Sequence, residues 1–321
     1  MSDLHTPVCD LLGIDVPIFL AGMGGVAYAE VCAAVSEAGG FGTLGMAGTP
    51  PNEIREEMRK VRALTDKPFG VDLLAALPDS IDQAADIIID EGAAAFIAGL
   101  GVPGPVIAKF HAAGVKVISM CGKMSHAVAA EEAGCDVVVA QGTEAGGHTG
   151  KVAGIALIPQ IADAVGIPVL AAGSIVDGRG LAAALAFGAQ GIWMGTRFVA
   201  SEEARAADVY KHKIVDAGSS DTVVTRCYSG KPMRNITNAY IEERERNPET
   251  ILRFPEQSVE SSRAGVMNLT LDTWEEMDPD RSCMPAGQGV GGIDEILPAG
   301  EIVQRILAEA RTAIGRLESL L

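Results

Sequence analysis

Short apolar segments recur along the first two thirds of the chain at intervals of roughly twenty to thirty residues, each ending on Gly, Ser, Thr, Asp or Gln. Strands of a parallel sheet are covered on both faces and therefore read as nearly continuous apolar runs. The pattern predicts eight such strands, over Pro17–Leu20, Phe41–Leu44, Phe69–Leu73, Ala94–Ala98, Val115–Met120, Asp136–Ala140, Pro168–Ala172 and Gln190–Met194.

The stretches between these segments have helical spacing, and several of them end on a glycine that suits a left-handed helix terminus, as at Gly39, Gly114 and Gly134. Alternating strands and helices also fit an open doubly wound sheet. Eight repeats, with polar groups spread over many strand ends, favour an α/β fold of the closed (β/α)₈ TIM barrel type. In such a barrel the active site lies at the carboxyl ends of the strands.

The pattern is interrupted after Arg197–Ala200, where the chain becomes charged and irregular. Helical spacing returns at Ile302, Ile306 and Ala310, and we expect this terminal helix to be the eighth barrel helix. Residues 1–204 and 298–321 are therefore predicted to form the barrel, and residues 205–297 an inserted, smaller, partly helical lid domain. The insertion is expected to wall the substrate site or to form an oligomer contact such as a homodimer interface, or both.

Composition narrows the functional classes. The 48% hydrophobic and 4% aromatic content, with 38 glycines, describes a core of small and branched aliphatic residues and excludes disorder. A net charge of −17 argues against nucleic acid or membrane partners, although backbone N–H groups can still hold one buried phosphate. Six scattered cysteines without metal spacing, and no visible secretory leader, indicate reduced thiols in a cytoplasmic protein without a metal.

The seventh and eighth predicted strands both end in glycine turns, Gly173-Ser174 and Gly195-Thr196. Loops after these two strands hold phosphate groups in many barrels, because glycine lets the backbone approach the anion closely. A turn needs glycine for its own geometry, so one such turn would be weak support. Two turns at these two strands predict a phosphate site.

The loop after the sixth strand is polar and rich in glycine, and it contains His148. An imidazole can accept or donate a proton near neutral pH, which makes His148 a candidate acid or base. Gln141 offers an amide to the edge of a heterocycle, and Glu144 either orients the loop or contacts substrate.

Other strand ends contribute further candidates. Gly22 and Met23 follow the first strand and can face a ring system. Asp72 ends the third strand as a buried acceptor or ligand contact, and Lys123 after the fifth strand forms an ion pair or contacts a ligand.

Four motifs in order, Gly22-Met23-Gly24-Gly25, Glu144-Ala145-Gly146-Gly147-His148, Ala172-Gly173-Ser174-Ile175 and Gly195-Thr196-Arg197-Phe198, resemble those of the nitronate monooxygenase family, formerly called 2-nitropropane dioxygenases. The resemblance extends to the late segment Pro285-Ala286-Gly287-Gln288-Gly289. It implies an enzyme with a TIM barrel that binds FMN non-covalently, a lid domain, and oxidation of alkyl nitronates with O₂ to carbonyl compounds and nitrite.

The resemblance also implies roles for individual residues. His148 matches the catalytic histidine of the family, which assists at the α-carbon proton of the substrate. The positions that match FMN contacts are Gly173, Ser174, Gly195 and Thr196 for the phosphate, and Gly22, Met23, Gln141 and Gly146 for the flavin. Asp72 joins them here as a further predicted cofactor contact.

The Glu144–His148 loop also resembles that of FMN-dependent enoyl-thioester reductases and NADH:quinone reductases. The segment Tyr228–Asn235 is similar to a basic segment of those reductases, so Lys231 or Arg234 would meet a phosphate of NAD(P)H or of a thioester. Trp193 departs from the commoner polar residue before Gly195. An NAD(P)H-dependent reductase therefore stays open as an alternative function, as does a barrel that binds a phosphorylated metabolite without redox chemistry.

Overall fold

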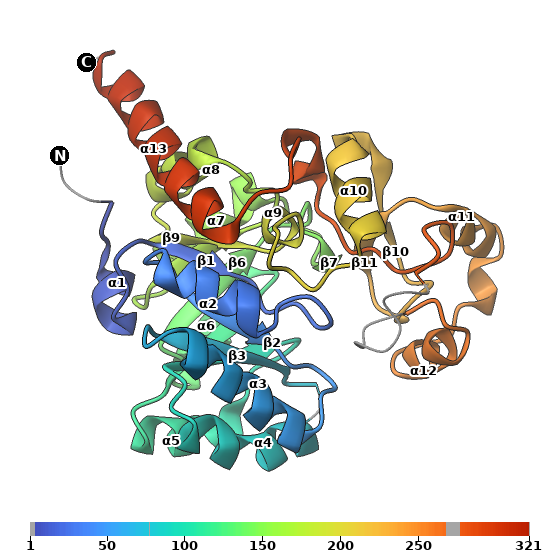
Figure 1. Cartoon of the computed structure of the whole chain (residues 1–321), viewed down its shortest axis with the longest axis horizontal. Helices are drawn as coiled ribbons and strands as arrows, with labels where there is room; N and C mark the ends of the chain where they lie inside the picture. The colour runs from blue at the N-terminus through green and yellow to red at the C-terminus, as the bar shows by residue number, and fades with distance from the viewer. Residues whose placement is uncertain (1–3, 77, 268–276, 321) are drawn as a thin grey trace.

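The computed structural model describes residues 4–76, 78–267 and 277–320. Most of the chain builds a barrel with helices around it, and the residues between the last barrel strand and the terminal helix build a smaller unit beside it (Figure 1). The first and last described residues lie on the barrel side of the molecule, far from the smaller unit.

Eight parallel strands form the barrel, in the order β1, β9, β8, β6, β5, β4, β3, β2. The two outer strands of this order also meet, because Leu20 N donates to Phe41 O at 2.9 Å and Phe41 N donates to Ile18 O at 2.9 Å. The closed barrel is thus confirmed, and an open doubly wound sheet is wrong. Each predicted segment matches its strand to within one residue: β1 (Ile18–Leu20), β2 (Gly42–Gly45), β3 (Phe69–Leu74), β4 (Ala95–Gly99), β5 (Lys116–Cys121), β6 (Val137–Gln141), β8 (Val169–Ala172) and β9 (Gly191–Met194).

Helices cover the outside of the barrel, and the terminal helix takes the eighth place by packing between α8 and α2 (Figure 1). Gly39, Gly114 and Gly134 follow their helices with φ of 92°, 78° and 98°, the predicted left-handed conformation. A short helix, α1 (Pro7–Leu12), packs against inward-facing residues such as Phe19 and Phe41. The covering helices are α2 (Ala29–Glu37), α3 (Pro51–Leu64), α4 (Pro78–Asp90), α5 (Gly104–Ala112), α6 (Met124–Glu132), α7 (Gly154–Ala164), α8 (Gly178–Ala186) and α13 (Ala299–Glu318).

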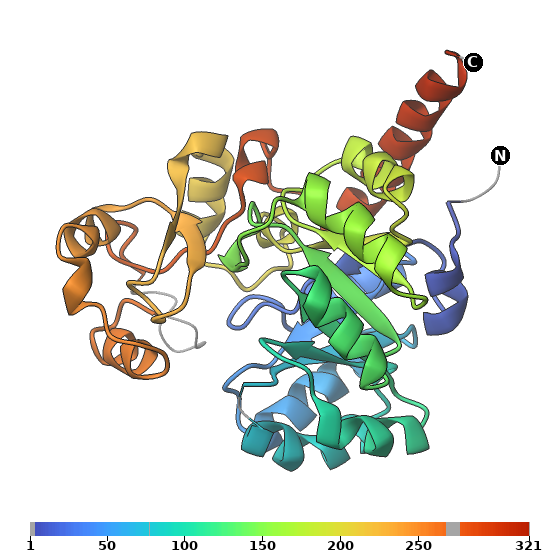
Figure 2. The same cartoon turned by 180° about the vertical axis from the view of Figure 1, so that it is seen from behind.

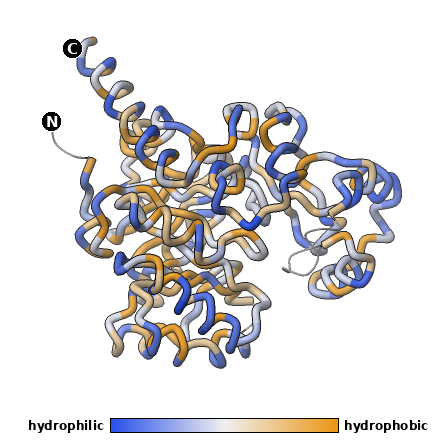
Figure 3. Tube along the Cα trace, viewed as in Figure 1, coloured by the Kyte–Doolittle hydropathy of each residue, from blue (hydrophilic) through white to orange (hydrophobic). Residues whose placement is uncertain are grey.

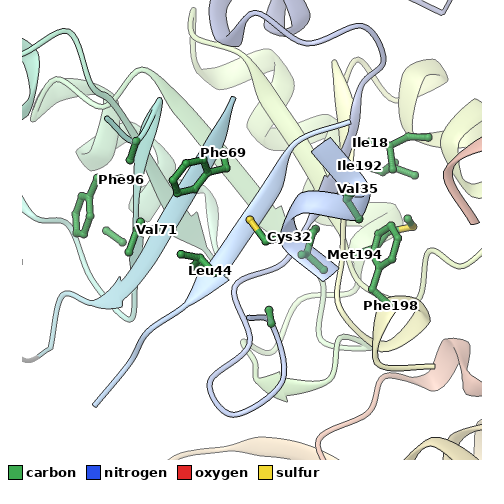
Figure 4. Close-up of a cluster of buried hydrophobic side chains, with 14 of the residues drawn as sticks. Ile18, Cys32, Val35, Leu44, Phe69, Val71, Phe96, Ile192, Met194 and Phe198 are labelled. Carbon is green, nitrogen blue, oxygen red and sulfur yellow. The ribbon is translucent and has the colours of Figure 1, made fainter. Parts of the chain in front are cut away.

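Alternate residues of each strand point to the helices or into the barrel. Ile192 and Met194 of β9 belong to the cluster between strands and helices, whereas Trp193 between them belongs to the cluster inside the barrel. Figure 4 shows the outer cluster, in which side chains of several strands meet Cys32 and Val35 of α2. The same alternation directs Asp72 and Gln141 inward at the carboxyl ends of their strands.

The smaller unit contains a sheet that the sequence analysis did not predict. Its strands β10 (Thr222–Thr225) and β11 (Met233–Ile236) are antiparallel, and β11 also pairs with β7 (Gly147–His148), which comes from the loop after β6. The unit therefore shares a sheet with the barrel's own loop (Figure 2). A single-turn helix, α9 (Thr196–Val199), directly follows β9, and the α-helices of the smaller unit are α10 (Asp208–Asp216), α11 (Ala239–Glu245) and α12 (Glu256–Arg263). The division at residues 204/205 and 297/298 stays a prediction.

Hydropathy along the chain follows this architecture, with apolar residues prominent in the barrel interior and polar ones on outward helix turns (Figure 3). Within the described ranges, every helix is too short or too polar to cross a membrane. All six cysteines are buried and unpaired.

Candidate functional site

A cavity of about 1500 Å³ opens at the carboxyl ends of the barrel strands and extends to the smaller unit. Residues from the turns after β1, β3, β6, β8 and β9 line it, as does one side of the smaller unit. This is the end of the barrel at which the sequence predicts the site. The structure brings eleven predicted residues to its wall: Gly22, Met23, Asp72, Gln141, Gly146, His148, Gly173, Ser174, Lys231, Gly195 and Thr196.

The turns after β8 and β9 lie side by side because the two strands pair in the barrel. Gly173 has φ of 113° and Ser174 has φ of 53°, so the first turn runs through the left-handed region. A Cβ at Gly173 would come no closer than 3.4 Å to the Glu144 carboxyl group, and one at Gly195 would lie 3.3 Å from the Met23 sulfur. Glycine at both positions leaves the backbone accessible from the cavity.

The hydroxyl groups of these two turns are already engaged by the late glycine-rich segment 287–289. Ser174 Oγ donates to Glu144 O at 3.0 Å and accepts from Gly289 N at 2.9 Å, and Thr196 Oγ1 accepts from Gly287 N at 3.0 Å. The side chains therefore fasten the late segment over the turns. An anion at this place would be met by backbone N–H groups.

His148 lies in β7, where the barrel loop pairs with the smaller unit. Its Nε2 lies 2.9 Å from Ser229 Oγ, and its carbonyl accepts from Gln141 Nε2 at 2.9 Å. Burial, and to a lesser extent the positive charge of Lys231, lowers the pKa of His148 to about 4. The imidazole is consequently neutral around pH 7 and can accept a proton.

Asp72 is an acidic side chain deep in the cavity. A Cβ at Gly22 would lie 2.2 Å from the Asp72 Cβ, so glycine is needed for the first and third strand ends to approach each other. Burial raises the pKa of the Asp72 carboxyl group well above its usual value. Within the described residues its side chain has no hydrogen-bond partner. Asp72 is half-buried at the cavity wall. A carboxyl group that loses water without gaining a partner is destabilised, so this one suits a ligand that carries an N–H group.

Three predicted contacts lie outside the cavity wall. Glu144 accepts from Gly154 N at 3.0 Å and so caps α7. Arg234 is buried and donates to Thr143 O at 3.0 Å through Nη2, which ties the smaller unit to the loop after β6. Lys123 is exposed at the start of α6 and is not among the lining residues.

Lys231, the remaining basic candidate, does line the cavity. Its ammonium nitrogen lies 4.3 Å from the centre of the Phe254 ring. No carboxylate of the described residues pairs with it. Its positive charge therefore faces the cavity near His148 without a carboxylate partner in the described part of the chain.

The sequence analysis missed several residues of the site. Ser229 lies in the segment Tyr228–Asn235, which the sequence analysis selected for its basic residues Lys231 and Arg234. The sequence did not indicate that Ser229 contacts His148. Phe254 and Ser258 reach the cavity from residues near or within α12, where the sequence gives no signal. Tyr28 and His126 also line it and read as ordinary helix residues.

The sequence model of the nitronate monooxygenase family matches residues 5–309. A protein of Rhodococcus jostii named (3aS,4S,5R,7aS)-5-hydroxy-7a-methyl-1-oxo-octahydro-1H-indene-4-carboxyl-CoA dehydrogenase is 43% identical over 234 residues. That alignment covers 73% of this chain and 66% of the relative, slightly less than two thirds of its length.

Two solved structures are similar over almost the whole chain. FabK from Thermotoga maritima is 38% identical with a TM-score of 0.91, covering 99% of both chains. A nitroalkane oxidase from Streptomyces ansochromogenes is 30% identical with a TM-score of 0.87, covering 97% of this chain and 99% of the other.

Proposed function

The chain belongs to the nitronate monooxygenase family and is an oxidoreductase, and from this premise we propose that it binds FMN in the barrel cavity and uses His148 to move a proton at the reacting carbon. One observation carries the proposal. A neutral, half-buried imidazole and two accessible glycine turns line the same cavity at the carboxyl ends of the strands.

The residues of the cavity fit FMN at both of its ends. The glycine turns at Gly173 and Gly195 suit a phosphate held by backbone N–H groups. Asp72 suits the N–H edge of the flavin ring, since its carboxyl group has no partner within the described residues. Gly22, Met23, Gln141 and Gly146 would lie along the ring. Bound FMN supplies the two-electron redox chemistry, and the protein supplies orientation and electrostatics.

His148 would serve as the acid or base of the reaction. Neutral imidazole accepts a proton from a carbon that is acidified by a neighbouring electron-withdrawing group, and the electron pair of that bond stays with the substrate. Lys231 lies in the same wall and would attract the negative charge that develops on such a group. The ring of Phe254 beside the Lys231 ammonium makes this part of the wall partly apolar, where charges interact more strongly than in water.

Alkyl nitronates, which form when a nitroalkane loses its α-carbon proton, are the first substrate class, oxidised with O₂ to carbonyl compounds and nitrite. His148 would accept that proton when the substrate arrives as the neutral nitroalkane. The family model and the 30% identical nitroalkane oxidase support this class. A nitronate carries its negative charge on the nitro oxygens, which matches the unpaired Lys231.

Acyl thioesters are the second class, with NAD(P)H or its oxidised form as the electron partner. The observation that favours them is the cavity, because about 1500 Å³ exceeds the usual ~300–1,000 Å³ of a ligand pocket. The 43% identical relative is named as a dehydrogenase of a carboxyl-CoA compound.

Parallel assays of the FMN-loaded protein separate these classes. Aerobic turnover of ethylnitronate or propionate 3-nitronate without NAD(P)H would establish the first class. Inactivity there, with rapid anaerobic bleaching by NADH or NADPH and turnover of crotonyl-CoA, would establish the second. Bleaching with turnover of a quinone alone would indicate a quinone reductase. A protein that cannot be loaded with FMN would contradict the proposal as a whole.

A further inference from the structure

Ser229 is a buried serine of the smaller unit that contacts the imidazole of His148. It has no exposed surface and lies in the turn between β10 and β11. Its Oγ is 2.9 Å from His148 Nε2. The residues are 81 positions apart in sequence, so the contact exists only when the smaller unit is docked on the barrel.

The remaining hydrogen bonds of the Ser229 hydroxyl limit what it can do. Its Oγ donates to Lys231 O at 3.3 Å and accepts from Lys231 N at 3.3 Å. A hydroxyl has one donor and two acceptor sites. When the donor serves the Lys231 carbonyl and one acceptor serves the Lys231 N–H, the remaining site is an acceptor, and it faces Nε2.

The opposite arrangement leaves more groups unpaired. If Ser229 donated to Nε2, the Lys231 carbonyl would lose its donor from Ser229, and the ring proton would sit on Nδ1. Nδ1 has no hydrogen-bond partner within the described residues. Nδ1 lies on the cavity side, so the pairing of the Lys231 carbonyl decides between the two arrangements.

We infer that Ser229 is a positioning residue that holds His148 as the tautomer protonated on Nε2, so that Nδ1 presents its lone pair to the substrate. The inference rests on the proposed role of His148 as acid or base. When Nδ1 takes the substrate proton, the imidazolium keeps its Nε2–H bond to Ser229, and this charge-assisted bond is stronger than the one in the neutral ring. The smaller unit thus completes the acid–base group of the barrel.

Nitrogen-15 NMR of the wild-type protein, labelled at histidine rings, tests the tautomer directly. The chain has five histidines, and the His148 signals are those lost in His148→Ala. The expected spectrum shows a protonated Nε2 and an unprotonated Nδ1. A spectrum with the proton on Nδ1 would overturn the inference, whatever the enzyme's activity.

Ser229→Ala tests the consequence for turnover. We expect FMN to be retained, KM to change little, and kcat to fall ~10-fold or more, because a misplaced proton removes part of the acid–base contribution. The His148 signals should show a mixture of tautomers. Ser229→Thr keeps a hydroxyl and should restore both the tautomer and most of kcat.

Ser261→Ala is the matched control. Ser261 is also fully buried in the smaller unit, bonds the Cys227 carbonyl, and does not line the cavity. It should keep the wild-type tautomer and kcat. If Ser229→Ala keeps the wild-type tautomer as well, Ser229 does not position His148. If His148→Ala keeps full activity while the tautomer is as expected, the role of His148 fails and the positioning by Ser229 stands.

Discussion

His148 is the residue on which the proposed chemistry depends, because it places a neutral imidazole at the cavity wall. His148→Ala removes the acid or base but none of the proposed FMN contacts. We expect the variant to retain FMN, while turnover of a substrate that gains or loses a proton at carbon, such as a neutral nitroalkane, falls by about 10²-fold or more, the usual scale for losing a positioned acid or base. Stopped-flow kinetics and the flavin absorption of the purified variant measure the two effects.

The control for this substitution is His212→Ala, an exposed histidine on α10. It should match the wild type in both measurements. Unchanged turnover in His148→Ala would make His148 structural.

The charge of Lys231 should be visible in the pH profile. The pKa of His148 is about 4, below its ordinary 6.5, because burial disfavours the imidazolium and Lys231 repels it. Activity that needs the neutral ring should stay level as pH falls from about 8 to about 5, and decline only near pH 4. Lys231→Met removes the repulsion, raises the pKa of His148, and should move the acid limb of kcat/KM to higher pH.

Lys151→Met is the control for this shift, since Lys151 is exposed and does not line the cavity. An acid limb near pH 6.5 in the wild type, or an unmoved limb in Lys231→Met, would contradict the role given to burial and charge.

At the scale of elements, the turn after β8 controls access to the proposed phosphate site. Gly173→Val places a branched side chain at φ of 113°, where the backbone faces the cavity. We expect this variant to lose FMN, as measured by flavin absorption after dialysis against excess FMN. Gly92→Val, at φ of 71° in an exposed turn with free space around it, carries comparable strain and should keep FMN. Stoichiometric FMN in Gly173→Val would place the phosphate elsewhere.

Arg234 joins β11 to the loop after β6, and its removal should weaken the junction between the two parts. The guanidinium donates to Thr143 O through Nη2 at 3.0 Å and Nε at 3.2 Å. Arg234→Met leaves this carbonyl without its donor, which costs about 1–3 kcal/mol when the group stays buried. Urea denaturation should show this loss, and Arg226→Met at an exposed position should not. Equal free energies of unfolding for Arg234→Met and Arg226→Met would contradict the role of Arg234 as a link between the smaller unit and the barrel.

The elements of the barrel could be predicted because each strand and helix carries its own pattern. The apolar run of β6 is continuous and the glycine after α6 is local, so neither needs tertiary information. The strand β7 differs, because Gly147 and His148 form a strand only by pairing with β11, more than eighty positions away. The expectation of irregular structure after residue 200 therefore missed a three-stranded sheet.

The same limit applies to the candidate site: the sequence predicts residues placed by a single strand, but not contacts between the barrel and the smaller unit. Residues at strand ends, such as Gln141 and Gly173, follow from the barrel itself. Two features depend instead on how the smaller unit packs on the barrel. One is the contact of His148 with Ser229. The other is the orientation of Arg234, which points to the Thr143 carbonyl and not into the cavity. A basic residue in sequence does not reveal whether its charge faces ligand or protein.

At the scale of the whole molecule, the proposal gives the barrel the turns that would hold the cofactor and gives the smaller unit the remaining wall of the substrate site. His148 lies where the two share a sheet, so the proposed reacting centre belongs to both. Changes that loosen the smaller unit should therefore reduce turnover more than they reduce FMN binding.

The central claim is that the barrel cavity holds FMN on the turns at Gly173 and Gly195. The most direct measurement is the absorption spectrum of the purified protein after incubation with FMN and removal of the excess. The account predicts about one FMN per chain, with the flavin band near ~450 nm, in the wild type and in Gly92→Val but not in Gly173→Val. A wild-type protein that stays colourless at every FMN concentration would contradict it.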